Sequence, residues 1–223
     1  MTIRKNEDFG RSIRHPTNLI ELQDDREIAR RYTQNSIEID VDVDVNVNEV
    51  EHNFTVTRGS IAQALGIDHK RIKVAESDAN DMTQVSIDLI KIEFRTARNR
   101  STNNIMFAAG SVVFQRTSLR SAFLIVSNSG IVKGRDIFPR AHPNDGVLDV
   151  LIIDSEISLR QRLIAWHKSK IGVHLPHPQL HVSRDTQYEW EGSPTRMIVD
   201  GATFHKVDWA RLSVIKDAFA ICF

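Results

Sequence analysis

The chain has 223 residues, of which 41% are hydrophobic and 26% charged, a composition typical of a globular protein and not of a disordered one. Its 29 basic and 29 acidic side chains balance to a net charge of zero, so we expect no nucleic-acid partner. The one cysteine, Cys222, excludes an internal disulfide and any zinc site built from several cysteines. No apolar run is long enough to cross a bilayer and the polar start carries no signal-peptide pattern, so we expect a cytoplasmic protein.

The N-terminal third begins with a strand pattern and a helix pattern. Residues 18–22 are apolar and end in Asp24-Asp25, and residues 24–35 then place apolar side chains at helical spacing. Residues 37–48 alternate between apolar and acidic or amide side chains, which predicts a long strand or hairpin. The run Asp40-x-Asp42-x-Asp44 resembles the start of a calcium loop, but the glycine and glutamate of such a loop are missing. A solvated strand face is the favoured interpretation.

A second strand and helix surround a glycine turn. Residues 54–57 predict a strand and residues 61–65 a short helix that ends at Gly66. Between them lies Arg58-Gly59-Ser60, and free N–H groups at a helix start attract phosphate. With a single glycine in the turn, an ordinary strand–helix connection is the favoured local interpretation.

From residue 82 onward the pattern is that of an all-β unit. Short apolar segments rich in β-branched residues predict strands at 85–92, 105–114, 122–126 and 147–153. Turn signals such as Asn-Ser-Gly and Pro-Asn-Asp-Gly separate them, as in a β-sandwich or barrel. The polar stretch 75–81 predicts a boundary between an N-terminal unit, 1–80, and a β unit, 81–223.

One helix interrupts the strands of the β unit. Ser158-x-x-Gln161 is a capping box, which marks its start. Leu159, Leu163 and Trp166 share one face, and the other positions carry basic side chains, Arg160, Arg162, Lys168 and Lys170. The pattern therefore predicts an amphipathic, basic helix.

Two Asp-Gly turns are candidates for chemistry. Residues 139–146 end in Pro-Asn-Asp-Gly, which is turn chemistry, although a tight loop of this kind can also direct carbonyls and one carboxylate at magnesium. Val199-Asp200-Gly201 is a strong hairpin signal, and the functional alternative is a carboxylate that acts as general base toward a hydroxyl. Local evidence favours plain turns at both places.

Three histidines, His174, His177 and His181, invite a zinc hypothesis. Zinc binding would need them on one face of a regular element, but Pro176 and Pro178 interrupt any helix. We therefore favour a role in positioning the loop.

Several of these blocks occur together in a known family. The blocks are Asn128, residues 139–150, Arg160-Gln161-Arg162, residues 172–178 and Val199-Asp200-Gly201. In order and spacing they resemble the diacylglycerol-kinase-like lipid kinases, in particular short actinobacterial members, over about residues 82–223. The resemblance implies an α+β fold, in which a truncated N-terminal α/β segment packs on a larger antiparallel β-sandwich of the diacylglycerol kinase/NAD kinase type.

The resemblance also implies site residues. Asp200 matches the general base of the family, but Ala202 stands where a glutamate is expected. A structural magnesium would lie at Asp145 and the carbonyls of His142 and Val147. The family's nucleotide motif, Gly-Gly-Asp-Gly-Thr, falls on Arg58-Gly59-Ser60-Ile61-Ala62, so Arg58, Gly59 and Ser60 would face the nucleotide and Ser60 replaces the aspartate.

These departures favour a diacylglycerol-kinase-like pseudoenzyme with lost or impaired phosphotransfer, a degenerate ATP site, and a retained site for a lipid or phosphorylated small molecule. The first alternative is an active ATP-dependent lipid kinase, which needs another carboxylate near the phosphates, with Asp8 and Asp136 as candidates. The second is a membrane-surface or partner-binding scaffold that docks through the basic helix 160–170. The sequence leaves open peripheral contact with the inner membrane and a homo-oligomer.

Overall fold

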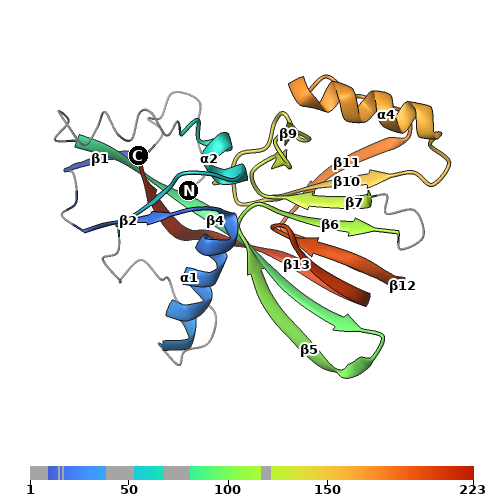
Figure 1. Ribbon diagram of the computed structural model, residues 1–223, viewed down its shortest axis with the longest axis horizontal. Coiled ribbons are helices and arrows are strands. Elements are labelled where there is room, and N and C mark those ends of the chain that lie inside the picture. Colours follow the sequence, from blue (N-terminus) through green and yellow to red (C-terminus); the bar gives the residue numbers. More distant parts are fainter. Residues whose placement is uncertain (1–9, 15, 17, 39–52, 68–80, 117–121) are drawn as a thin grey trace.

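The computed structural model describes residues 10–14, 16, 18–38, 53–67, 81–116 and 122–223. These residues form mostly antiparallel β-sheet with a few helices, which confirms the predicted α+β class with a large β-sandwich (Figure 1). None of the helices in the described ranges has the length and apolar character needed to span a bilayer.

The N-terminal part is a small α/β segment. Its elements are β1 (Arg11–Arg14), β2 (Leu19–Leu22), α1 (Asp25–Glu38), β3 (Asn53–Val56) and α2 (Ser60–Ala64). β2 and β3 pair in parallel, and α1 lies between them in the sequence. The strand predicted to begin at Ile37 is wrong at its first two positions, because α1 has no glycine or proline to stop it and continues to Glu38. The remainder of that strand, with its acidic face, lies outside the described residues.

Antiparallel strands build the sandwich, and two short ones, β8 and β9, pair with each other in a separate small sheet. They are β4 (Asp81–Thr96), β5 (Asn99–Ala108), β6 (Ser111–Gln115), β7 (Ala122–Ser127), β8 (Ile131–Val132), β9 (Arg135–Asp136), β10 (Leu148–Ile153), β11 (Leu180–Asp185), β12 (Gln187–Val199) and β13 (Ala202–Cys222). The main sheet runs β1-β4-β13-β12-β6-β7-β10-β11, and β5 pairs with β4. The single strand predicted at 105–114 is wrong, because the chain turns at Ala109-Gly110 and makes two strands, β5 and β6.

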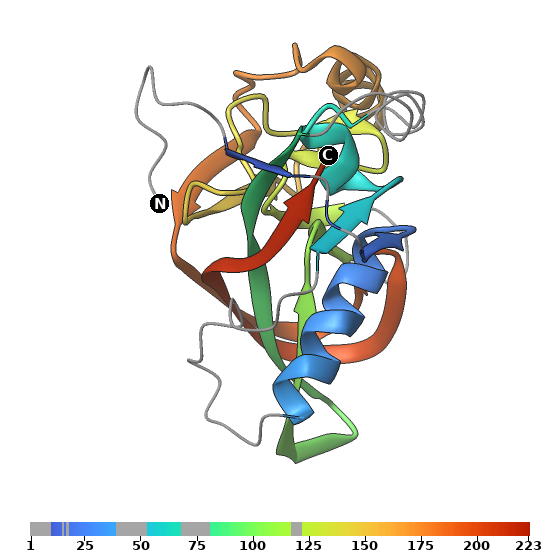
Figure 2. The same ribbon diagram turned by 90° about the vertical axis from the view of Figure 1, so that its left-hand side faces the viewer.

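β13 joins the two parts of the molecule. It pairs with β4 and β12 in the sandwich, and near its end Ile221 pairs in parallel with Phe54 of β3. The ring of Phe219 stacks on Phe54 with centroids 4.7 Å apart. Figures 1 and 2 both place the end of the chain beside the N-terminal elements. The boundary predicted near residue 80 falls where the structure is not described, and it stays a prediction.

The predicted helix is α4 (Leu159–Lys168), which continues into the 3-10 turn η2 (Ser169–Ile171). The capping box is confirmed, since the Ser158 hydroxyl accepts from the backbone N–H of Gln161 while the Gln161 side chain bonds the Ser158 N–H. α4 lies over β10 and β11 on the outside of the sandwich (Figure 1), with Ala165 packed in the core there.

Candidate active site

Asp200 and Gly201 form the tight turn between β12 and β13, as the hairpin signal predicts. Both residues have positive φ, 42° and 85°, which matches the turn that suits twisted hairpins. This turn directs the Asp200 carboxylate toward the β5–β6 turn. There it accepts hydrogen bonds from the backbone N–H groups of Ala109 (2.8 Å), Gly110 (3.1 Å) and Ser111 (2.7 Å). Asp200 can therefore be a hairpin residue and also present its carboxylate as a general base.

A second carboxylate, that of Asp25, reaches the same place from the N-terminal segment. Asp25 begins α1 directly after β2, and its side chain is buried. Its two oxygens accept from the backbone N–H groups of Ser60 (2.7 Å) and Ile61 (3.1 Å) at the start of α2. Asp25 therefore fixes the glycine turn 58–60 in position.

Gly110 marks the point where the two carboxylates meet. A Cβ added there would lie 2.8 Å from Oδ2 of Asp25, 3.0 Å from Oδ1 of Asp200 and 3.1 Å from Oγ of Ser60. A Cβ at Gly59 would collide with the Asp25 carboxylate, and Gly59 also has a φ of 103°. Both positions need glycine because the carboxylates approach the backbone closely.

Burial raises the pKa of both acids. Burial and the charge of Asp25 together raise the pKa of Asp200 to about 7, although the three N–H donors act in the opposite direction. Burial likewise raises the pKa of Asp25, against the hydrogen bonds from Ser60 and Ile61. An aspartate with a pKa near 7 exchanges a proton readily at neutral pH, which suits a general base.

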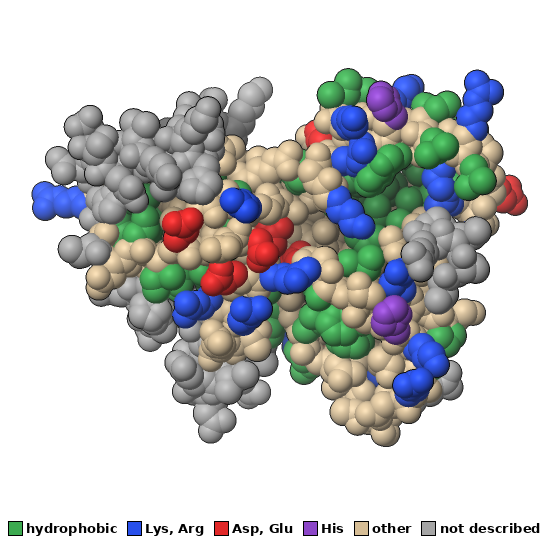
Figure 3. All heavy atoms as spheres, viewed as in Figure 1, with side chains coloured by type: hydrophobic (Ala, Val, Ile, Leu, Met, Phe, Trp, Pro, Cys, Tyr) green, Lys and Arg blue, Asp and Glu red, His purple; other side chains and the backbone are tan. Residues whose placement is uncertain are grey.

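Basic side chains border the carboxylates. Arg26 donates from Nε to the backbone oxygen of Asp200 at 2.8 Å and lies over Gly201, where an added Cβ would come within 2.7 Å of its guanidinium. Arg58 is exposed in the neighbouring turn. Figure 3 shows acidic side chains gathered in the middle of this face with basic ones directly beside them. The site can therefore neutralise an anion as well as accept a proton.

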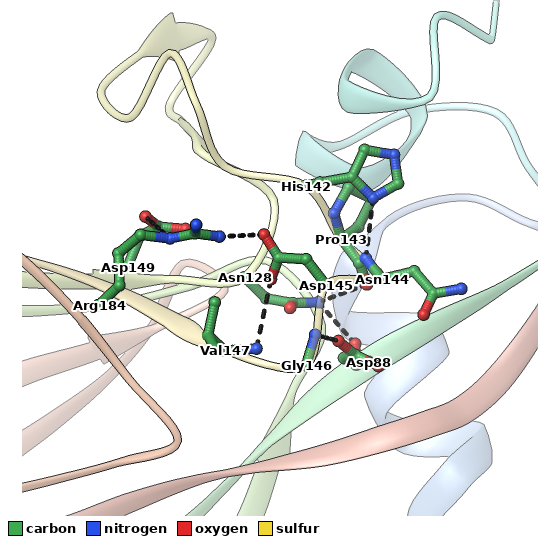
Figure 4. Close-up of polar contacts among 10 residues, drawn as sticks. All are labelled: Asp88, Asn128, His142, Pro143, Asn144, Asp145, Gly146, Val147, Asp149 and Arg184. Carbon is green, nitrogen blue, oxygen red and sulfur yellow. Dashed lines mark hydrogen bonds and ion pairs between the residues drawn. The ribbon is translucent and has the colours of Figure 1, made fainter. Parts of the chain in front are cut away.

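The loop between β9 and β10, where the sequence predicts magnesium, is a separate cluster (Figure 4). Asp88 of β4 anchors it: its oxygens accept from the N–H groups of Gly146 (2.7 Å) and Asp217 (2.9 Å). Asp88 is fully buried, and burial raises its pKa. Asn128 donates to the backbone oxygen of Asp88 at 2.6 Å. These contacts connect the loop to β4, β7 and β13.

Asp145 itself pairs with an arginine. One carboxylate oxygen accepts from Val147 N at 3.2 Å, and the other forms an ion pair with Arg184 of β11. Arg184 also contacts Asp149 through Nε at 3.2 Å (Figure 4). Because the guanidinium already neutralises Asp145, these residues do not fit a magnesium ion unless Arg184 moves aside. Magnesium bound by Asp145, His142 and Val147 stays a prediction.

The three histidines and Asp136 do not join the site. In the described residues no group of three His, Cys, Asp or Glu side chains could hold a metal, and this includes His174, His177 and His181. Asp136 lies against Gly172, and Asp8 is outside the described residues. The carboxylate that lies close to Asp200 in the described residues is that of Asp25.

Sequence analysis did not identify Asp25 as a site residue, although its position in the chain carried a signal. Asp24-Asp25 stands between a strand and a helix, and ligands of α/β proteins bind at such strand ends. Gly110 and Arg184 carried no comparable signal, because their roles depend on neighbours far away in the chain.

The comparisons with known proteins bear on this geometry. A family model described as the YegS C-terminal NAD kinase beta sandwich-like domain matches residues 73–220. The chain belongs to this family. With the solved structures below, the match supports the predicted diacylglycerol-kinase-like lipid kinase family. No curated protein matches the sequence.

Two solved structures from Bacillus anthracis strain Sterne, each described as a "putative diacylglycerol kinase", share the fold. The first has a TM-score of 0.54 at 12% identity and the second a TM-score of 0.50 at 13% identity. In both cases the match covers 92% of this chain and 77% of the other. At this identity the likeness establishes the fold alone.

Proposed function

We propose that this protein is an ATP-dependent kinase that phosphorylates a lipid hydroxyl, with Asp200 as the general base. The observation that carries the proposal is the convergence of Asp25 and Asp200 on Gly110. The active alternative required a second carboxylate near the nucleotide turn 58–60, and Asp25 supplies one that is bonded directly to that turn.

Each group has a defined task in this proposal. Asp200 accepts the proton of the lipid hydroxyl as the phosphoryl group is transferred, and its pKa of about 7 makes it a stronger base than an ordinary aspartate near neutral pH. Asp25 would hold the magnesium of the bound nucleotide, which supplies charge neutralisation for the phosphates. Arg26 and Arg58 add positive charge at the border of the site. The lipid chain would lie toward the sandwich, and the enzyme would work in the cytoplasm at the inner membrane surface.

A second candidate function is ligand binding without phosphotransfer. Two N–H groups at the start of α2, those of Ser60 and Ile61, already donate to Asp25 and are not free for phosphate. Ala202 also stands where the family resemblance leads to a glutamate. In this second candidate function the protein binds a lipid or a phosphorylated small molecule and does not transfer a phosphoryl group.

Calorimetric titration with Mg-ATP, followed by transfer of labelled γ-phosphate to diacylglycerol in mixed micelles, tests the proposal. We expect Mg-ATP binding and phosphate transfer by the wild type, with transfer lowered about 100-fold or more in Asp200→Asn while binding persists. Asp25→Asn should weaken Mg-ATP binding. The matched control is Glu21→Gln, an exposed carboxylate on the preceding strand, which should change neither.

Two outcomes would contradict the proposal. Mg-ATP binding without transfer to any lipid hydroxyl would favour the second candidate. Absence of Mg-ATP binding at millimolar concentration, with the far-ultraviolet spectrum of the folded protein unchanged, would exclude the kinase.

A further inference from the structure

α4 presents its apolar stripe to solvent. Leu159 is 75% exposed and Leu163 68% exposed, and Trp166 on the same face is 43% exposed. The stripe continues past the helix through Ile171 and Val173, which are 74% and 54% exposed. Contiguous exposed apolar side chains of this kind are uncommon on a free protein surface and mark an interaction site.

Polar contacts fix this orientation. The inner face of α4 consists of Arg162, Ala165 and, at the start of η2, the buried Ser169. Arg162 donates to the backbone oxygens of Ala122 (2.8 Å) and Asp154 (3.4 Å), so the helix is tied to the sheet by a charged side chain. Turning the leucines inward would break these bonds and leave Arg162 without partners, so the outward stripe is a property of the fold.

Trp166 is also held in place at this surface. The guanidinium of Arg135 lies over its ring, 3.9 Å from the centroid, and donates to the Trp166 backbone oxygen at 2.6 Å. The contact places a cation beside an aromatic ring that faces outward. Tryptophan and arginine side chains arranged in this way suit the boundary between lipid headgroups and acyl chains.

The helix and the turn that follows it carry cations and no acidic side chain, although the half-buried Asp136 of β9 lies beside Gly172. From residue 157 to residue 183 the sequence contains no Asp or Glu. Of the cations within this stretch, Arg160, Lys168 and Lys170 are exposed, while Arg162 lies on the inner face. Figure 3 shows hydrophobic and basic side chains intermixed over the α4 side of the molecule, at the upper right of the view. Apolar side chains interleaved with cations complement an anionic lipid surface.

We propose that α4, η2 and Val173 form a docking surface for a bilayer that contains anionic lipid. The leucines, Ile171 and Trp166 enter the boundary between headgroups and acyl chains, while Lys168 and Lys170 meet the lipid phosphates. A second copy of the chain is a poorer occupant, because a symmetric contact would bring the same cations against each other. The docking does not depend on catalysis at Asp200.

Vesicle co-sedimentation tests the proposal with wild type and variants. We expect binding to vesicles of phosphatidylcholine with phosphatidylglycerol, weakening at high salt, and little binding to phosphatidylcholine alone. The double variant Leu159→Ser, Leu163→Ser should lose at least about tenfold in affinity, because each buried methylene contributes to insertion. Lys168→Gln with Lys170→Gln should lose about tenfold on anionic vesicles only.

The matched control is Ile105→Ser, which removes a 56% exposed isoleucine from β5, away from α4, and should bind vesicles as the wild type does. Asp200→Asn should also bind normally, which separates failure of docking from failure of the kinase. Equal loss in the Ile105 variant, or no binding of the wild type to anionic vesicles, would overturn the proposal. So would a dimer, seen by analytical ultracentrifugation, that the leucine variant dissolves.

Discussion

Asp200 holds its proton to a pH at which a free aspartate is ionised. Its carboxylate is surrounded by three backbone donors, yet burial and the neighbouring Asp25 outweigh them, and the pKa is raised from 3.8 to about 7. Two acids placed so close together repel in the ionised form, and such pairs are typical of functional sites. Burying the two acids together therefore lowers the stability of the protein at neutral pH, and the same environment makes Asp200 a stronger base.

We predict that Asp25→Asn lowers the pKa of Asp200, because it removes the adjacent negative charge. Carboxyl ¹³C chemical shifts followed through a pH titration measure it, and Glu21→Gln should leave the titration unchanged. In the wild type the raised pKa means that the contribution of Asp200 to stability is fully present below the unfolded pKa of 3.8 and is lost as the pH rises through about 7. An unchanged Asp200 titration in Asp25→Asn would show that the two side chains do not interact.

Among the elements, the loop between β9 and β10 illustrates how one cation can organise several carboxylates. Arg184 of β11 bridges Asp145 of the loop and Asp149 of β10. Burial raises the pKa of Asp149 to about 6, although Arg184 acts in the opposite direction. Asp88 secures the other side of the loop through Gly146. The register of β10 against β11, which pairs Asp149 with Arg184, builds this contact.

We predict that Arg184→Met destabilises the protein by about 2 kcal/mol, less than the loss of a fully buried pair because the arginine side chain is half exposed. With the guanidinium gone, magnesium should raise the melting temperature of the variant but leave that of the wild type unchanged. Arg211→Met, which removes a surface pair with Glu189, is the matched control. It should keep the stability of the wild type, and magnesium should not change its melting temperature. A wild-type melting temperature that falls on chelation would show instead that magnesium binds beside Arg184.

At the scale of the whole molecule, β13 makes the N-terminal segment and the sandwich one structure. A bulge near Asp217 separates the stretch that pairs within the sandwich from the stretch that reaches β3. The N–H of Asp217 bonds to the buried Asp88, which fixes the bend. The carboxylate pair depends on this connection, because Asp25 comes from the N-terminal segment and Asp200 from the turn that precedes β13.

We predict that Phe219→Ala destabilises the protein by about 3–4 kcal/mol, since it removes a buried ring that stacks on Phe54. Because β13 is shared, denaturant unfolding followed by tryptophan fluorescence and by far-ultraviolet circular dichroism should still coincide in one transition. Phe204→Ala, at a half-buried ring of the sandwich, should cost less. Two separate transitions in the wild type would show that the parts fold independently.

The sequence by itself determined the features that depend on local patterns. The capping box at Ser158, the hairpin at Asp200-Gly201 and the alternating strands were all readable, because caps, turns and side-chain periodicity are properties of neighbouring residues. Order and spacing of the blocks in residues 82–223 also indicated the family. Local patterns gave wrong predictions at two places. Helix α1 continues past Ile37, where a strand was predicted to begin, and the chain turns at Gly110, where one continuous strand was predicted.

Only the tertiary structure decided which distant residues meet and which face of a helix is covered. Asp25 reaches Asp200 because β13 brings the end of the chain to the N-terminal segment, and Arg184 reaches Asp145 through strand pairing. Amphipathic spacing in α4 could not tell which face points inward, because Arg162 finds backbone oxygens under the helix while the leucines do not. Such choices follow from packing and from the satisfaction of buried polar groups across the whole fold, which no short stretch of sequence contains.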